Sequence, residues 1–380
     1  MTDLLDYCHT DTEKKYVKAY LECNNFAEVS RLVGKTRATV REQILRVQAR
    51  AAKKEKGEHV DKVPQGYAIK GVSTLFNGEG GVTAQWVKTD RDAQLQIEAV
   101  EKAVASICKA LPKAKVVKAP KNLEQDLCSL YTFTDYHLGM MAWDKESGDD
   151  WDIDIAQDTL ATALEQMAQG PESELGILNI QGDFCHWDGL DAVTPAHKHV
   201  LDADTRFDKL VEISLRMCIN GVQRLLEKHK TVRVIICEGN HDLASSVWLR
   251  KSLKAIFSSN KRVSIDDTAF PYYAYLHGQI MLGFHHGHKM KNKALPTLFS
   301  SEPRYREMWG KAKYTYIHTG HYHHAEQDMA ENGGAIVERH PTLSARDAYA
   351  SRGGYVSWRA ARAITYHKQK GEVSRITVVP

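Results

Sequence analysis

The spacing of apolar and polar residues predicts helices at the start of the chain. Over residues 11–56, apolar side chains recur every three or four positions, which is the period of an amphipathic helix. Asn24-Asn25 and Gly34 interrupt this pattern, and such residues commonly end helices. We therefore expect three helices, over 13–22, 26–33 and 36–56. Their apolar faces are expected to hold Tyr16, Val17, Tyr20 and Leu21 in the first helix and Val40, Ile44, Leu45 and Val47 in the third.

The period changes beyond residue 60. Residues 66–76 and 82–89 read as two strands around the Gly-rich turn NGEGG, which predicts a β-hairpin. Residues 93–111 return to helical spacing, and the Pro- and Lys-rich stretch 112–122 is typical of a linker. These changes predict three parts: a helical domain at 1–60, a hairpin, helix and basic linker at 61–122, and a larger domain at 123–380.

The larger part alternates strand-like and helical stretches. Its apolar runs are LCSLYTFT, ILNIQ, VRVIICE, QIMLGFH and YTYIHTG, and helical spacing occupies 154–169 and 207–229. This alternation predicts an α/β domain built on a central sheet. The last fifty residues hold further strands without a clear helical core, and a second sheet packed on the first would accommodate them.

Composition narrows the class of protein. The chain is 43% hydrophobic and 26% charged, as in soluble globular proteins, and it contains no apolar run of 18 residues that would cross a membrane. Its first residues lack the basic and apolar regions of a signal peptide. Seven scattered cysteines without a C-x-x-C pair argue against a disulfide framework or a cysteine zinc site. We expect a cytoplasmic protein with no membrane partner.

Charge is distributed unevenly. Residues 1–122 hold 22 Lys and Arg against 15 Asp and Glu, whereas the remainder holds 29 against 33. Residues 1–122, here called the head, are basic, and the remainder is mildly acidic. This difference suggests that the head binds an anionic partner, and the alternative is a merely solubilising region. Nine basic residues lie within 31–56 against two acidic ones, so the third predicted helix carries much of the excess.

The head resembles the helix-turn-helix of phage and transposase-type DNA-binding proteins. The shared plan is a short helix, a shorter helix, a Gly turn and a basic third helix, over about 45 residues. The resemblance implies DNA as a partner and, for a phage-encoded protein, the cytoplasm of a bacterial host. The alternative is a three-helix docking module that binds no nucleic acid. The candidate DNA contacts are Lys35, Arg37, Arg41 and Arg46.

Metal-binding residue types follow five strand-like runs in succession. The blocks are Asp135-Tyr136-His137, Gly182-Asp183, Gly239-Asn240-His241-Asp242, His285-His286-Gly287-His288 and Gly320-His321-Tyr322-His323-His324. Ligands bind at the carboxyl ends of strands in open α/β sheets, so these turns can converge on one site. Oxygen and imidazole donors without thiolates favour Mn²⁺, Fe or Zn²⁺. The set is too large for one tetrahedral zinc ion and suits two ions that share a carboxylate.

In this order the blocks resemble the calcineurin-like metallophosphoesterase superfamily, whose pattern is D-x-H, G-D, G-N-H-D/E, H-G-H and G-H-x-H. The resemblance covers residues 127–324 and implies a β-sandwich flanked by helices, in four αββα layers. It also implies a phosphoester hydrolase in which a hydroxide bridging two divalent metal ions is the nucleophile. Mn²⁺ is the favoured metal, and Fe or Zn²⁺ are alternatives.

The resemblance also implies roles for individual residues. The first metal would take Asp135, His137 and His323, Asp183 would bridge, and the second would take Asn240, His286 and His321. His241 would face the substrate phosphate and protonate the leaving oxygen, and Asp242 would orient His241. His285 is the alternative to His286, and His288 would hold a ligand in place. His186 and Arg339 would lie near the substrate, unless they are only loop and strand-end residues.

A basic helix-turn-helix joined to a phosphoesterase favours DNA as the substrate. The leading hypothesis is therefore a Mn²⁺-dependent DNA nuclease, similar in its catalytic part to the double-strand-break-repair nucleases of this superfamily. One alternative is a phosphatase or cyclic-nucleotide phosphodiesterase that acts on small molecules or proteins. Another is a DNA-binding adaptor without catalysis, against which the complete ligand set argues. The long helices and spare C-terminal strands leave room for a homodimer.

Overall fold

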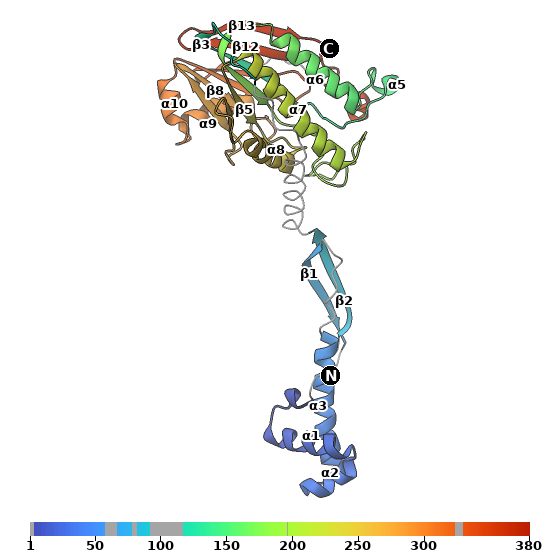
Figure 1. Ribbon diagram of the computed structural model, residues 1–380. Helices are drawn as coiled ribbons and strands as arrows, with labels where there is room; N and C mark the ends of the chain where they lie inside the picture. Colours follow the sequence, from blue (N-terminus) through green and yellow to red (C-terminus); the bar gives the residue numbers. More distant parts are fainter. Residues whose placement is uncertain (1–3, 58–66, 78–81, 92–116, 196, 324–329) are drawn as a thin grey trace. The chain divides into compact units, whose positions relative to one another are not determined.

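The computed structural model describes residues 4–57, 67–77, 82–91, 117–195, 197–323 and 330–380 (Figure 1). By its internal contacts the chain divides into two compact units, Met1–Val100 and Glu101–Pro380. The predicted helix over 93–111 and most of the predicted linker fall outside the described residues. The boundaries expected at residues 60 and 122 therefore stay predictions.

The first unit begins with the three helices that the sequence predicts. After a short 3-10 helix, η1 (Leu4–Tyr7), come α1 (Asp11–Cys23), α2 (Phe26–Val33) and α3 (Arg37–Gly57). Thr10 caps α1 by accepting a hydrogen bond from the amide of Glu13, and Asn25 caps α2 in the same way through Ala27. Gly34 ends α2 at φ 65°, in the left-handed region that favours glycine.

The three helices share a small apolar core. Tyr16, Val29, Val40 and Ile44 are buried against one another. Leu21 and Leu45, expected on the apolar faces, are instead 52% and 43% exposed. Each directly follows a core-facing position, so it is rotated about 100° around the helix axis, away from the core.

The predicted hairpin is present in the first unit. Strands β1 (Tyr67–Phe76) and β2 (Val82–Arg91) pair antiparallel, with Ser73 opposite Trp86. Irregular register at Ile69–Gly71 marks a bulge in β1, and irregular register at Leu75–Phe76 marks one in β2, between Val82 and Ala84. The Gly-rich turn between the strands lies largely outside the described residues.

Two mixed sheets form the second unit. The six-stranded sheet has the order β13-β12-β3-β4-β5-β6, and β3 through β6 run parallel. Its strands are β3 (Glu124–Phe133), β4 (Ser173–Ile180), β5 (Thr231–Ile236), β6 (Val263–Ile265), β12 (Ala361–His367) and β13 (Gly371–Val378). The five-stranded sheet has the order β10-β11-β9-β8-β7. Its strands are β7 (Tyr273–His277), β8 (Ile280–Phe284), β9 (Tyr314–Thr319), β10 (Ala330–Asn332) and β11 (Ala335–Arg339).

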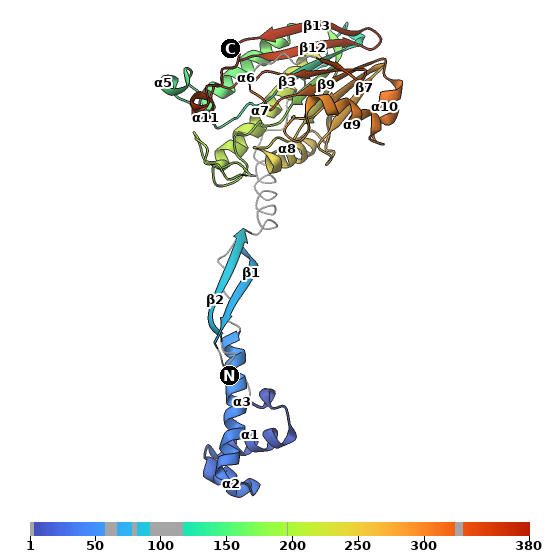
Figure 2. The same ribbon diagram turned by 180° about the vertical axis from the view of Figure 1, so that it is seen from behind.

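The main apolar core lies between the two sheets. Leu130 and Ile177 from the first sheet meet Leu282 and Phe284 from the second. Helices cover the outer faces, as Figures 1 and 2 show. On the six-stranded sheet lie α6 (Ile153–Met167), α7 (Phe207–Lys228) and α8 (Leu243–Ile256), and on the other lie α9 (Leu295–Ser301) and α10 (Arg306–Lys311). The predicted four-layer αββα arrangement is confirmed.

Short elements complete the second unit. A 3-10 helix, η2 (Asn292–Ala294), leads into α9, and two short helices, α5 (Asp144–Ser147) and α11 (Ala348–Arg352), pack against each other (Figure 2). Among the residues that the structure describes, none forms a helix long and apolar enough to cross a membrane.

Candidate metal centre

Four of the predicted site residues have an unusual backbone conformation. Asp135, His137, Asp183 and His321 have φ values of 49°, 48°, 50° and 73°. Non-glycine residues rarely adopt this left-handed region, and such strain persists only where the surroundings impose it. Here two strand-end turns hold each other, because the amides of Asp135 and His137 donate to the carbonyls of Gly182 and Asp183. The turns thereby aim their side chains at one place.

Two glycines allow these turns to approach closely. A Cβ atom on Gly239 would lie 1.9 Å from Oδ1 of Asp183, and one on Gly320 would lie 1.9 Å from Oγ1 of Thr134. No side chain fits at either position without moving a candidate ligand or its neighbour. The glycines of the G-N-H-D and G-H-x-H blocks are therefore needed for space.

One group of potential ligands contains Asp135, His137 and His323, whose ligand atoms lie within 4.8 Å of one another. Nε2 of His137 is 3.0 Å from Nε2 of His323, and the latter is 3.5 Å from Oδ1 of Asp135. The three residues come from the ends of β3 and β9, so the structure brings together the set expected for the first metal.

A second group contains Asp135, Asp183, His286 and His321. Nε2 of His286 is 3.1 Å from Oδ2 of Asp183 and 3.8 Å from Oδ1 of Asp135. Asp135 is common to both groups, whereas the resemblance gives the bridging role to Asp183; that role stays a prediction. His286, not His285, enters this group. His285 instead packs on Tyr272 and directs Nδ1 toward the carbonyl of Pro271.

The donor atoms suit divalent cations. Oδ1 of Asp135 and Oδ1 of Asn240 are buried and make no hydrogen bond within the described part of the chain. Burial opposes ionisation of Asp135 and Asp183, but the neighbouring histidines, His286 foremost, together outweigh burial and lower the pKa of both carboxyls. His286 donates from Nδ1 to the carbonyl of Gln181 at 2.9 Å, which leaves Nε2 as a ligand atom. Buried oxygens and imidazole nitrogens with this orientation fit Mn²⁺, Fe or Zn²⁺.

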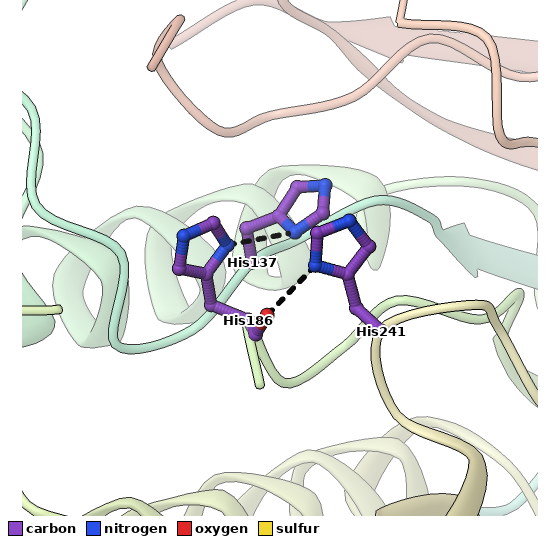
Figure 3. Close-up of side chains that lie close together, drawn as sticks. All are labelled: His137, His186 and His241. Carbon is purple, nitrogen blue, oxygen red and sulfur yellow. Dashed lines mark hydrogen bonds between the residues drawn. The ribbon is translucent and has the colours of Figure 1, made fainter. Parts of the chain in front are cut away.

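A third group consists of His137, His186 and His241 (Figure 3). Nδ1 of His186 is 3.2 Å from Nδ1 of His137, and the ring of His186 stacks on that of His241. His241 donates from Nδ1 to the backbone carbonyl of His186 at 2.8 Å. Burial and the nearby His241 lower the pKa of His186 to about 3. The side chain of His186 thus lies within the candidate site, beside a predicted ligand and the predicted proton donor.

Asp242 has a different place from the one expected. Its buried carboxylate accepts hydrogen bonds from the backbone amides of Phe184 at 2.7 Å, Gly239 at 2.8 Å and Asp183 at 3.2 Å. Burial and the nearby Asp183 raise its pKa to about 7. The expectation that Asp242 orients His241 is therefore corrected: the carbonyl of His186 orients His241, and Asp242 joins the loop after β4 to the loop after β5.

The remaining predicted residues lie at the edge of the centre. The ring of His288 is 5.4 Å from that of His286, and both its nitrogens are buried without a hydrogen bond among the described residues. Arg339 places its guanidinium 4.5 Å above the ring of Tyr322. A contact of Arg339 with substrate stays a prediction.

Several supporting residues were not predicted. Thr342 and Ser344 donate from their hydroxyls to the carbonyl of Asp135 at 2.6 and 2.9 Å, which fixes the strained turn. They lie more than 200 positions from Asp135, so no local pattern links them. His318, Glu338 and His340 form a further buried group. Its carboxylate is already paired with Arg362 at 2.8 Å and with Arg375 at 2.9 Å, so this group does not fit a cation.

The candidate DNA contacts belong to the first unit. Lys35, which precedes α3, and Arg37, Arg41 and Arg46 on α3 are all exposed. Arg46 forms an ion pair with Glu42 at 2.7 Å. Exposure leaves these side chains accessible to an anionic partner, and DNA binding itself stays a prediction.

No family model and no curated protein matches the sequence. Among solved structures, the chain is similar to a conserved Streptococcus pneumoniae protein described as a predicted phosphoesterase (10% identity, 68% of this chain, 100% of that chain, TM-score 0.27). It is also similar to vacuolar protein sorting 29 from Cryptosporidium parvum (12% identity, 67% of this chain, 100% of that chain, TM-score 0.29). A third similar structure is the phosphopantetheinyl hydrolase of Mycobacterium tuberculosis (11% identity, 60% of this chain, 93% of that chain, TM-score 0.26). At these TM-scores the likenesses do not bear on activity.

Proposed function

We propose that the second unit is a calcineurin-like metallophosphoesterase that hydrolyses phosphodiester bonds with two divalent metal ions. The observation that carries this proposal is the pair of adjacent ligand groups that share Asp135, built from buried carboxylates and imidazoles. In this assignment Asp135, His137 and His323 hold one ion, and Asp183, Asn240, His286 and His321 complete the site of the other.

The chain's own residues supply binding and proton transfer. Bound divalent ions would supply Lewis acidity toward the phosphoryl oxygens and the attacking water. The carbonyl of His186 holds His241 through Nδ1, which leaves Nε2 to donate a proton to the departing ester oxygen. His186 packs against His241 and His137, so it keeps both rings in position. The strained turns fix the ligand oxygens before substrate arrives.

DNA is the proposed substrate, with Mn²⁺ as the proposed metal. The support is electrostatic: residues 31–56 of the first unit hold nine basic against two acidic side chains, and Arg37, Arg41 and Arg46 on α3 are exposed. An exposed basic helix next to a Gly turn is suited to the phosphates and groove of a duplex. The first unit would bring the phosphodiester to the second.

Digestion of end-labelled linear duplex and single-stranded DNA tests this function. Wild type and Asp183→Ala are compared with Mn²⁺, Mg²⁺, Fe²⁺ and Zn²⁺, and bound metal is measured in parallel. We expect cleavage by wild type and none by the variant, which should also lose bound metal. Hydrolysis of bis(p-nitrophenyl) phosphate without any DNA cleavage would exclude the nuclease and leave a phosphoesterase of another substrate class. No hydrolysis of either would exclude both.

A further inference from the structure

A hollow on the surface of the second unit reaches the candidate metal centre. His323, a predicted ligand of the first metal, forms part of its lining. The rest of the lining includes Arg346 and Arg359, the ring of Tyr355, and Asp149 from the segment after α5. In this region α5 and α11 lie side by side (Figure 2). Any group bound in the hollow is therefore next to a phosphate held at the metals.

Arg346 gives the hollow an uncompensated positive charge. Arg346 is half-buried as a whole residue, and the hydrogen bond that it donates to the carbonyl of Tyr355 is long, at 3.4 Å. No carboxylate in the described ranges forms an ion pair with it. Arg359 differs, because it pairs with Asp149 at 3.4 Å and donates from Nε to the carbonyl of Leu343. Arg346 thus keeps most of its five donors for a ligand, and its planar fork matches a phosphate.

The position of Arg346 is fixed relative to the metal ligands. It follows Thr342 and Ser344, whose hydroxyls hold the carbonyl of Asp135. Arg359 anchors the same segment through Leu343. An anion bound by Arg346 would therefore lie at a constant distance from the centre.

An aromatic ring indicates what accompanies the anion. Tyr355 lines the hollow together with Arg346 and is 48% exposed. An exposed aromatic ring beside an arginine is suited to stacking on a nucleobase, and this stacking tolerates any base sequence. Inorganic phosphate or a phosphoprotein would not use this ring.

We propose that the hollow binds the phosphate next to the scissile phosphodiester, with Arg346 on this phosphate and the ring of Tyr355 against the adjoining base. This inference rests on the proposed nuclease function and deepens it. It makes Arg346 a specificity residue, which favours a polynucleotide over a small diester that has no neighbouring phosphate.

The test compares two substrates in the full chain with Mn²⁺. One is a labelled oligothymidylate, and the other is bis(p-nitrophenyl) phosphate, which lacks a second phosphate and a base. The readout is the ratio of kcat/KM for the first to that for the second. Arg346→Ala should lower this ratio by about ten-fold to a hundred-fold, because one charge-assisted contact is lost. Arg346→Lys should restore part of it. The matched control is Arg352→Ala, exposed on α11 and paired with Glu146, which should leave the ratio unchanged.

The outcomes separate this inference from the function on which it rests. DNA cleavage by wild type with an unchanged ratio in Arg346→Ala would refute the proposed role of the hollow and leave the proposed nuclease function intact. Failure of wild type to cleave DNA would overturn both. If Arg346→Ala does not fold, the ratio in Tyr355→Ala decides, because that residue is 48% exposed and its side chain contributes little to stability. A fall in that ratio would support stacking of a base on Tyr355, and no change would refute it.

Discussion

At the residue scale, the carboxylate of Asp242 acts by accepting hydrogen bonds from backbone amides. It accepts three hydrogen bonds of 3.2 Å or less, from Asp183, Phe184 and Gly239. These amides belong to the two loops that carry Asp183 and Asn240, so Asp242 sets the separation of predicted ligands. It is a positioning residue and does not touch the reacting groups.

Asp242→Ala should therefore weaken metal binding as well as rate. The variant leaves buried amides without partners, each at a cost of about 1–3 kcal/mol. We expect metal affinity to fall by about ten-fold or more, as when a group that orients a ligand is lost. The measurement is metal titration by calorimetry, together with the melting temperature.

His241→Ala provides the contrast for Asp242→Ala. It should keep both metals and lose rate by about a hundred-fold to ten-thousand-fold, because only proton donation is removed. If Asp242→Ala instead kept full metal occupancy and changed only the pH–rate profile, Asp242 would be the partner of His241 and the structural correction would be wrong.

Gly239 offers a second test at the residue scale. A Cβ at this position would lie 1.9 Å from Oδ1 of Asp183, so Gly239→Ala should displace that carboxylate and abolish metal binding. Gly310→Ala is the matched control, because nothing lies within 4 Å of a Cβ there and alanine favours α10 by about 1 kcal/mol. Metal content and melting temperature distinguish the two. Equal metal content in both variants would show that a Cβ at position 239 does not displace Asp183.

At the scale of elements, the loop that follows α7 is held by a buried histidine. His229 follows Lys228 at the end of α7, and its Nδ1 donates to the carbonyl of Ser173 on β4 at 2.8 Å. Its Nε2 accepts from the hydroxyl of Tyr131 on β3, also at 2.8 Å. One neutral ring therefore joins a helix end to two strands of the six-stranded sheet.

This junction predicts a pH dependence of stability. Burial lowers the pKa of His229 from 6.5 to about 4, helped by the nearby Lys228 and opposed by Ser173 and Glu172. A depressed histidine pKa means that the unfolded chain takes up its proton first as the pH falls. The stabilising contribution is therefore complete above pH 6.5 and is lost as the pH falls toward 4, by about 3 kcal/mol.

Urea unfolding between pH 7.5 and pH 4.5 measures this effect. His229→Gln should be less stable than wild type at pH 7.5, and its free energy of unfolding should fall less steeply with falling pH. The chain has 18 histidines, so the difference between the two slopes, rather than either slope, isolates His229. An identical pH dependence of the free energy of unfolding in wild type and His229→Gln would contradict a lowered pKa of His229 in the folded protein.

Local patterns predicted the elements better than the contacts between them. The three helices of the first unit, the hairpin and the strand ends bearing Asp135, Asp183 and His286 follow from short-range spacing and glycine placement. The amide contacts of Asp242 and the hydroxyl groups of Thr342 and Ser344 that hold the carbonyl of Asp135 depend on segments distant in sequence. Residue type alone does not specify such partners.

At the scale of the whole molecule, charge separates the two ends of the sequence. The proposal that the first unit binds DNA predicts a salt-dependent affinity, because each phosphate contact releases counterions. Arg37→Ala with Arg41→Ala should reduce the slope of log affinity against log salt by about 1.8, at about 0.9 per lost contact. Fluorescence anisotropy of a labelled duplex, with the full chain carrying Asp183→Ala to prevent cleavage, gives this slope.

A charge-matched variant serves as the control for the DNA-binding test. Lys14→Ala with Lys18→Ala removes the same two charges from α1, where both side chains are exposed. A slope that falls equally in both variants would indicate a general effect of net charge and would refute a specific role for α3. No salt dependence in wild type would refute DNA binding by the first unit.

The hydrogen bonds that Thr342 and Ser344 donate to the carbonyl of Asp135 also have a consequence for biosynthesis. The turn bearing Asp135 follows β3, yet its carbonyl is held by Thr342 and Ser344, and β3 gains its antiparallel neighbour only with β12. A ribosome that has translated all five ligand blocks, through His323, has still not made the residues that hold the first of them. The centre is therefore expected to mature late in translation, so that a proposed nuclease stays latent while most of its own chain is being made.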